Sequence, residues 1–99
     1  MHRRTKCCSI SKQTKAKVYE RDDGLCIFCH RPGDPVAHVV NRAHGGLGIE
    51  QNIVCACAEC HTRLDNTTSR QTMLGYAKSY LRGKYEGWNE DELIYKKWG

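Results

Sequence analysis

Residues 26–61, CIFCHRPGDPVAHVVNRAHGGLGIEQNIVCACAECH, decide the fold of this chain. Two CxxC pairs lie near the ends of the stretch, Cys26 with Cys29 and Cys57 with Cys60. Four thiolates are the ligand set of a tetrahedral structural zinc ion, and residues 30–56 between the pairs are long enough to fold back as a hairpin. The spacing therefore predicts one zinc ion with a closed coordination shell that holds the two ends of a hairpin together.

The segment between the two pairs is typical of two strands joined by a glycine-rich loop. Residues 35–40 are rich in β-branched residues and predict a strand, and residues 49–55 predict a second, short one. Residues 41–50 carry glycines at 45, 46 and 48 and predict a loop. Because the second cysteine pair opens a helix that runs to about Asp65, we expect the order strand, loop, strand, helix.

Helices are expected on both sides of this hairpin. Residues 12–21 contain good helix formers after Ser11, whose hydroxyl can cap the helix, and Gly24 suits the left-handed residue that follows a helix end. A longer helix is expected from Ser69 to about Lys84, and Asn89 resembles the cap of a short final helix. The three- and four-residue spacing of apolar and aromatic residues predicts a buried face on the long helix, made of Met73, Tyr76, Ala77, Tyr80 and Leu81.

The chain of 99 residues fits one small α+β domain, whose thin core a metal staple is expected to support. We divide it into a flexible basic arm at residues 1–10, a helix with the hairpin core at residues 11–66, and C-terminal helices at residues 67–99. Basic residues exceed acidic ones, 16 against 11, and the net charge of +5 is typical of domains that bind polyanions such as nucleic acid.

Hydrophobicity and cysteine content indicate the cellular compartment. The chain has no apolar run of about 18 residues and no hydrophobic segment behind its start, so we expect neither a membrane span nor a secretory signal and place the protein in the cytoplasm. Seven cysteines, an odd number, and the CxxC spacing favour reduced thiols over disulfides. We expect Cys55 to be a small buried apolar residue and Cys7 and Cys8 to be exposed thiols.

The pattern CIFC…VAHVVNRAHGGLGIEQNIVCACAECH resembles the zinc-containing HNH endonucleases, and its AH and HGGLG segments are similar to those of small bacteriophage proteins. The resemblance covers residues 26–65 and implies a ββα-metal, treble-clef-like fold that cuts DNA phosphodiester bonds, as a nick or a double-strand break. It implies that His38 is the general base that activates water, that Asn52 ties down the loop, and that His61 binds a catalytic divalent metal. That metal, Mg²⁺, Mn²⁺, Ni²⁺ or Zn²⁺, is distinct from the structural zinc.

One departure from the family concerns the metal ligands. Most HNH enzymes carry a second ligand directly before the base, where this chain has Ala37. Asp65 lies four residues after His61, hence on the same helix face, and is the first candidate to replace that ligand. His44 in the glycine loop is the second, as a ligand or as a contact to the scissile phosphate. The alternatives are a helix-end carboxylate that pairs with a nearby arginine and an exposed loop histidine.

Basic residues beside the hairpin are candidates for DNA contacts. Arg42 follows the first strand, where its guanidinium could clamp a phosphate. Nothing in the chain resembles a base-reading module, so we expect double-stranded DNA to be bound with low sequence specificity. The other cations that could follow a phosphate backbone are Arg63, Arg70, Lys78, Arg82 and Lys84.

The resemblance also implies partner proteins and a cellular location, and two alternative functions remain open. A phage protein of this kind would work beside DNA-packaging proteins in the host cytoplasm, as a monomer or weak dimer. The main alternative is a zinc-stabilised DNA-binding or assembly module that keeps the HNH fold but has lost cleavage, which Ala37 favours. A third interpretation, a zinc ribbon that mediates protein contacts, requires the two histidines and Asn52 to be coincidental.

Overall fold

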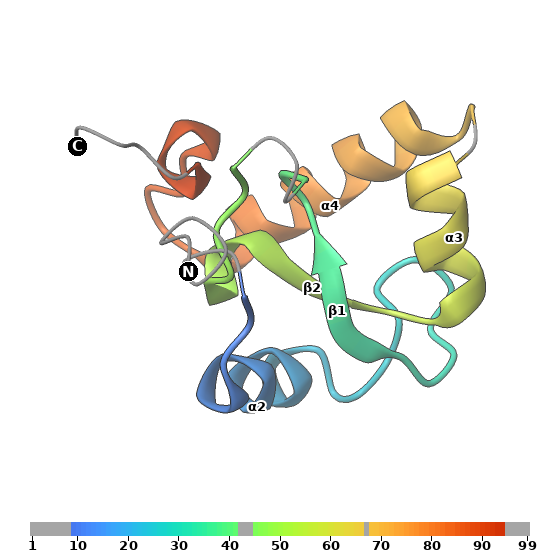
Figure 1. Cartoon of the computed structure of the whole chain (residues 1–99), viewed down its shortest axis with the longest axis horizontal. Helices are drawn as coiled ribbons and strands as arrows, with labels where there is room; N and C mark the ends of the chain where they lie inside the picture. The colour runs from blue at the N-terminus through green and yellow to red at the C-terminus, as the bar shows by residue number, and fades with distance from the viewer. Residues whose placement is uncertain (1–8, 42–44, 67, 95–99) are drawn as a thin grey trace.

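The computed structural model describes residues 9–41, 45–66 and 68–94. Within these ranges the chain forms a two-stranded antiparallel hairpin and three α-helices, so the predicted small α+β class is confirmed. Figure 1 shows the hairpin across the middle of the molecule, with helix α2 on one side and helix α4 on the other. No helix in the described ranges is long and apolar enough to cross a bilayer.

The hairpin consists of β1 (Asp34–His38) and β2 (Ile53–Ala56), with His38 opposite Ile53. The register shifts on either side of Val36, which makes this residue a β-bulge. β1 is shorter than the predicted strand over residues 35–40, because the chain leaves the ladder after His38 and turns into the glycine loop.

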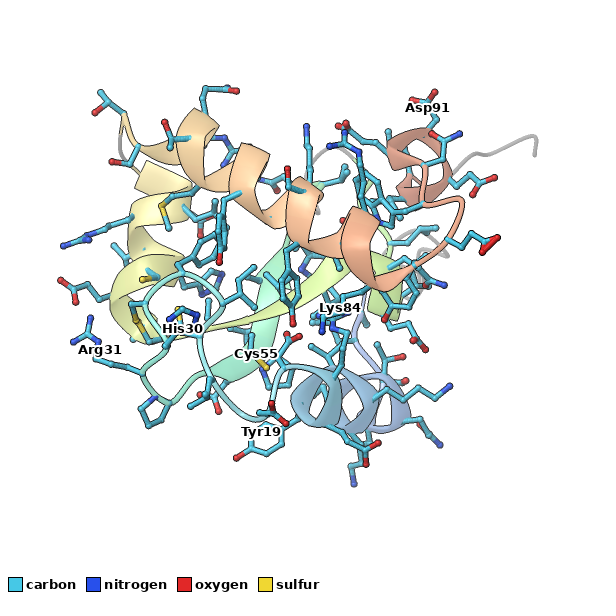
Figure 2. All side chains as sticks on the ribbon, turned by 180° about the vertical axis from the view of Figure 1, so that it is seen from behind. Tyr19, His30, Arg31, Cys55, Lys84 and Asp91 are labelled. Atoms are coloured by element: carbon cyan, nitrogen blue, oxygen red, sulfur yellow. The ribbon has the colours of Figure 1, made fainter. Side chains whose placement is uncertain are left out.

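Helices cover both faces of β2, so all of its residues are buried. Ile53 and Cys55 pack with Val18 of α2 (Lys12–Arg21), whereas the other two residues of β2 face the larger core. This alternation is the two-residue period of a strand. Cys55 is fully buried, as predicted for a small apolar residue, and Figure 2 shows it between the hairpin and α2.

The helix α2 has the predicted bounds and the predicted ends. The hydroxyl of Ser11 accepts a hydrogen bond from the Thr14 N–H at 3.1 Å, which satisfies one free donor of the first turn. Beyond the helix, Gly24 has a φ of 66° and donates its N–H to the Tyr19 carbonyl at 2.9 Å. The chain therefore turns out of the helix towards the first cysteine pair.

The larger core lies between the hairpin and two helices, α3 (Ala58–Asn66) and α4 (Arg70–Lys84). α3 starts at the second cysteine pair, as predicted. The predicted inner face of α4 is wrong at Tyr76, which is 48% exposed and contacts Phe28 with the two rings tilted by 45° and their centroids 5.9 Å apart. The residues of α4 that are buried in this core are Leu74, Ala77 and Leu81.

The C-terminal part of the described chain is connected to the glycine loop. Asn89 caps a 3-10 turn, η3 (Glu90–Leu93), rather than an α-helix. The Leu47 N–H at the end of the loop donates to the Leu93 carbonyl at 2.7 Å. The remainder of the predicted final helix, residues 95–98, lies outside the described residues, as do residues 1–8 of the predicted arm with Cys7 and Cys8.

A partly buried ion pair connects α2, β2 and α4. The Arg21 guanidinium donates to both carboxylate oxygens of Asp22, at 2.7 and 2.9 Å, and to the Ile53 carbonyl at 2.7 Å. The same carboxylate accepts from the Tyr80 hydroxyl and, at 3.0 Å, from the Cys55 N–H. Burial raises the pKa of Asp22, but the hydrogen bonds from Arg21, Tyr80 and Cys55 outweigh it and leave this pKa lowered.

Candidate functional site

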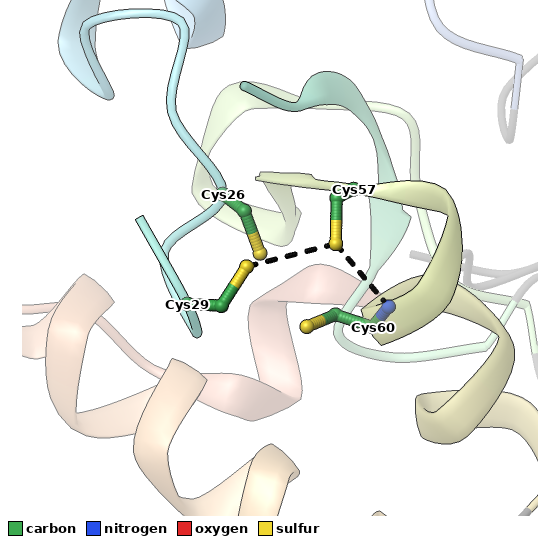
Figure 3. Close-up of side chains that lie close together, drawn as sticks. All are labelled: Cys26, Cys29, Cys57 and Cys60. Carbon is green, nitrogen blue, oxygen red and sulfur yellow. Dashed lines mark hydrogen bonds between the residues drawn. The ribbon is translucent and has the colours of Figure 1, made fainter. Parts of the chain in front are cut away.

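The four cysteines of the two CxxC pairs converge on one point, as predicted. Their Sγ atoms all lie within 4.8 Å of one another, and the Sγ atoms of Cys29 and Cys57 are 3.7 Å apart (Figure 3). Four sulfurs at about 2.3 Å from a tetrahedral zinc ion would be about 3.8 Å apart, so the cluster could hold a structural metal ion such as zinc after small adjustments. The Cys60 N–H donates to the Cys57 sulfur at 3.4 Å, which helps orient this ligand.

Arginine beside the cluster favours the thiolate form of one ligand. The Arg31 Nε donates to the Cys29 sulfur at 3.4 Å, and this bond, together with hydrogen bonds from the Arg31 backbone and the neighbouring cysteines, lowers the pKa of the Cys29 thiol to about 6. Arg31 is itself held by Glu59 of α3, at 2.5 Å. Burial raises the pKa of the Cys60 thiol instead, so a cation must displace the proton from this ligand.

A pocket of about 440 Å³ lies on the side of β1 that faces away from the larger core. Its walls include His38 at the end of β1, with His61 and Asp65 from α3. The pocket thus brings together three residues that we singled out for catalysis or metal binding from the sequence.

His61 and Asp65 stand close enough to share one cation. Their spacing of four residues places them on the same face of α3, and the His61 Nε2 and Asp65 Oδ2 atoms are 3.7 Å apart. Two ligand atoms at about 2.1 Å from one ion lie about 3.0–3.4 Å apart, so a small side-chain rotation brings this pair into range. Among the described residues, only the four cysteines form a group of three or more close metal ligands. A cation on His61 and Asp65 would take its other ligands from water and substrate, as Mg²⁺ commonly does.

Asn52 connects the two ends of the glycine loop. Its side chain is 0% exposed; Oδ1 accepts from the Val40 N–H at 2.7 Å, and Nδ2 donates to the Val40 and Leu47 carbonyls at 3.2 and 2.7 Å. The Asn52 carbonyl also accepts from the Val39 N–H at 2.8 Å. Because Val39 and Val40 directly follow His38, these bonds fix the backbone beside the histidine.

Gly46 in the same loop lies against the backbone of Val40. A Cβ atom at position 46 would be 1.7 Å from the Val40 carbonyl oxygen, which no side chain allows. The Gly46 N–H donates to the Asn41 carbonyl at 3.0 Å. The loop closes back on the end of β1 only because this position lacks a side chain.

Ala37 points away from the pocket. Val36 and His38 both line the pocket, whereas Ala37 is 0% exposed and belongs to the larger core. A side chain at position 37 of this strand therefore faces the larger core rather than the pocket. The bulge at Val36, which the sequence does not predict, contributes to this orientation of Ala37.

The predicted DNA-binding residues have different surroundings. Arg63 forms an exposed ion pair with Glu59 at 3.0 Å, and Arg70 donates to the Leu64 carbonyl at 3.1 Å. The phosphate-clamp candidate Arg42 and the ligand candidate His44 lie outside the described residues. Of the further cations, Lys78 pairs with Glu90, Arg82 lies over the Trp88 ring, and Lys84 lies over the Tyr80 ring.

The sequence did not indicate the pocket wall that α2 and the preceding residues form. Ser9, Ile10 and Lys15 line the pocket together with His61 and Asp65, and Figure 1 shows α2 and α3 on different sides of β1. Lys15 is an exposed residue of α2. Only the packing of α2 on the hairpin places it beside the histidines.

Comparison of the sequence with protein-family models gives no match, and comparison with curated proteins gives none either. The resemblance to the HNH endonucleases therefore rests on the motif residues.

Proposed function

We propose that this chain is a metal-dependent DNA endonuclease of the HNH kind, which hydrolyses phosphodiester bonds with low intrinsic sequence specificity. The supporting observation is that one pocket is lined by His38, His61 and Asp65. A base and a pair of metal ligands around one pocket are the groups that metal-assisted hydrolysis of a phosphodiester uses. In this proposal β1, β2 and α3 form the ββα-metal unit, and zinc on the four cysteines is structural only.

Each residue has a defined task in the proposed reaction. The His38 imidazole accepts the proton of a water molecule that attacks the phosphorus atom. His61 and Asp65 would hold a divalent cation, whose charge would stabilise the scissile phosphate and the leaving oxygen. Asn52 keeps the chain after His38 in place through its bonds to Val40 and Leu47.

Double-stranded DNA is the proposed substrate. The net charge of +5 attracts a polyanion, and Arg63 and Arg70 near the ends of α3 and α4 are the proposed phosphate contacts. No described element resembles a base-reading helix, which agrees with low sequence specificity. Proteins of a phage DNA-packaging complex are the partners that the motif resemblance favours.

The test is the nicking of supercoiled plasmid by zinc-loaded protein with added Mg²⁺, Mn²⁺ or Ni²⁺ and without added metal. We expect metal-dependent nicking that His38→Asn lowers by about 10²- to 10⁴-fold, the usual contribution of a general base. His30→Asn is the matched control, because His30 lies beside the zinc cluster, does not line the pocket, and has a φ of 65° that asparagine tolerates. Equal activity of the two variants would refute the role of His38.

A second function, a zinc-stabilised DNA-binding or assembly module without cleavage, is favoured by one observation. Ala37 is buried in the core, so this strand supplies no ligand at that position. This alternative predicts retained binding of duplex DNA with no nicking under any of the three metals. It also predicts that Asp65→Asn leaves the affinity for Mn²⁺ unchanged, whereas the endonuclease predicts a loss that isothermal calorimetry can measure.

A further inference from the structure

Three lysines of α2 differ in their surroundings, although all are exposed. Lys17 forms an ion pair with Glu50 at 3.6 Å, and Lys12 does not line the pocket that contains His38. Lys15 alone of the three lines the pocket that contains His38, His61 and Asp65. In the described part of the chain, no hydrogen bond or ion pair engages its ammonium group.

The same wall of the pocket carries a second source of positive potential. Ser9 and Ile10 line the pocket immediately before Ser11, the N-cap of α2. The first turn of α2 contains no acidic residue that would neutralise the positive end of the helix dipole. The α2 side of the pocket is therefore suited to an anion, opposite the side where His61 and Asp65 stand.

From this arrangement, and building on the proposed function, we infer that Lys15 binds the scissile phosphate group inside this pocket. Its ammonium contacts a non-bridging oxygen from the α2 side, while His61 and Asp65 of α3 would hold the divalent cation whose charge the proposed reaction uses. A lysine ammonium carries three donors and a compact charge, so it binds a phosphate oxygen without selecting a base. The role differs from that of Arg63 and Arg70, which are proposed to contact neighbouring phosphates.

A binding experiment tests this inference without requiring cleavage. Inorganic phosphate is titrated into zinc-loaded, full-length protein with Mg²⁺ present, and the imidazole NMR signals of His38 and His61 are followed. We expect both to shift, and we expect Lys15→Ala to weaken phosphate binding by at least about tenfold. Lys12→Ala, on the same helix but outside the pocket, should bind as the unmodified protein does. Unshifted imidazole signals, or equal affinities of the two variants, would overturn the role of Lys15.

A kinetic experiment separates binding at the scissile phosphate from binding along the DNA. The rates on bis(4-nitrophenyl) phosphate and on plasmid are compared, and Lys15→Ala should lower both by about tenfold or more, with Lys15→Arg restoring most of the loss. A loss on plasmid alone, reversed by saturating DNA, would place Lys15 outside the reaction centre and overturn the inference. Unmodified protein that binds phosphate through Lys15 but cleaves neither substrate would refute the endonuclease and leave the phosphate site standing.

Discussion

Asn52→Ala is expected to destabilise the protein more than the loss of one ordinary polar side chain. The Asn52 amide is fully buried and makes three hydrogen bonds, to the Val40 N–H, the Val40 carbonyl and the Leu47 carbonyl. Alanine removes all three and leaves these backbone groups without their partner. The connection between the two ends of the glycine loop is lost with them.

The expected cost follows from the individual bonds. A buried hydrogen bond contributes about 1 kcal/mol net, so three bonds give about 3 kcal/mol, and unsatisfied backbone groups left behind act in the same direction. For a domain of this size, about 1 kcal/mol corresponds to about 4–8 °C in the midpoint of thermal unfolding. Asn52→Ala should therefore lower that midpoint by about 12–24 °C.

The assay is urea unfolding of the zinc-loaded protein at a fixed free zinc concentration, because bound metal contributes to the apparent stability. Gln51→Ala is the matched control, since Gln51 precedes Asn52 and its contact to the Trp88 indole uses the backbone carbonyl, which the substitution keeps. Hydrogen exchange of the Val40 amide gives a local readout and should accelerate in Asn52→Ala. A loss below about 1 kcal/mol, or unchanged protection at Val40, would refute the proposed bracing of the loop.

Four further outcomes are expected. Chelation of zinc should lower the free energy of unfolding by about 4 kcal/mol if the ion was present at about a thousand times its Kd, measured by urea unfolding with and without chelator. The Gly46→Ala variant should unfold at a lower temperature than the unmodified protein and should exchange the Val40 amide hydrogen faster, because the new Cβ would overlap the Val40 carbonyl. Equal melting temperatures of the two proteins would show that the loop shifts to accommodate the methyl group. The folded-state pKa of Asp22 is lowered from 3.8, so its carboxylate stabilises the fold above about pH 3.8, and this stabilisation is lost as the pH falls further, through the folded-state pKa. Asp22→Asn should therefore show a smaller decline in the urea unfolding midpoint on acidification. Ala37→Asp should lower the free energy of unfolding by several kcal/mol without raising the affinity for Mn²⁺, because position 37 faces the core. Tighter Mn²⁺ binding in calorimetry would show that a side chain at this position reaches the pocket.

Local determinants made part of the fold predictable. The spacing of the two CxxC pairs predicted the cysteine cluster, because four thiolates at such intervals have few other uses in a reduced chain. The bounds of α2 follow from the hydroxyl of Ser11 and the conformation of Gly24, both encoded within a few residues. The four-residue spacing of His61 and Asp65 placed them together on one helix face in the same way.

Tertiary packing decided what the sequence could not predict. Arg21 and Asp22 look like the ordinary charged end of a helix, yet the hydroxyl of Tyr80 and the backbone of β2 convert them into a buried pair. The orientation of Ala37 goes with the shift in strand register at Val36. Lys15 gains its place on the pocket wall from the angle at which α2 packs on the hairpin, for which the helix sequence carries no signal.

The ion pair of Arg21 and Asp22 also has a consequence for the order of events during synthesis. A nascent chain that has emerged as far as residue 61 contains all four cysteines, so every side chain of the candidate metal cluster is present. The same chain lacks Tyr80, which is 58 residues from Asp22, and Tyr85, whose hydroxyl accepts a hydrogen bond from the Arg21 guanidinium at 3.0 Å from 64 residues away. The charged end of α2 therefore gains both tyrosine partners only when α4 and the following Tyr85 have left the ribosome, after all four cysteines of the cluster are already available.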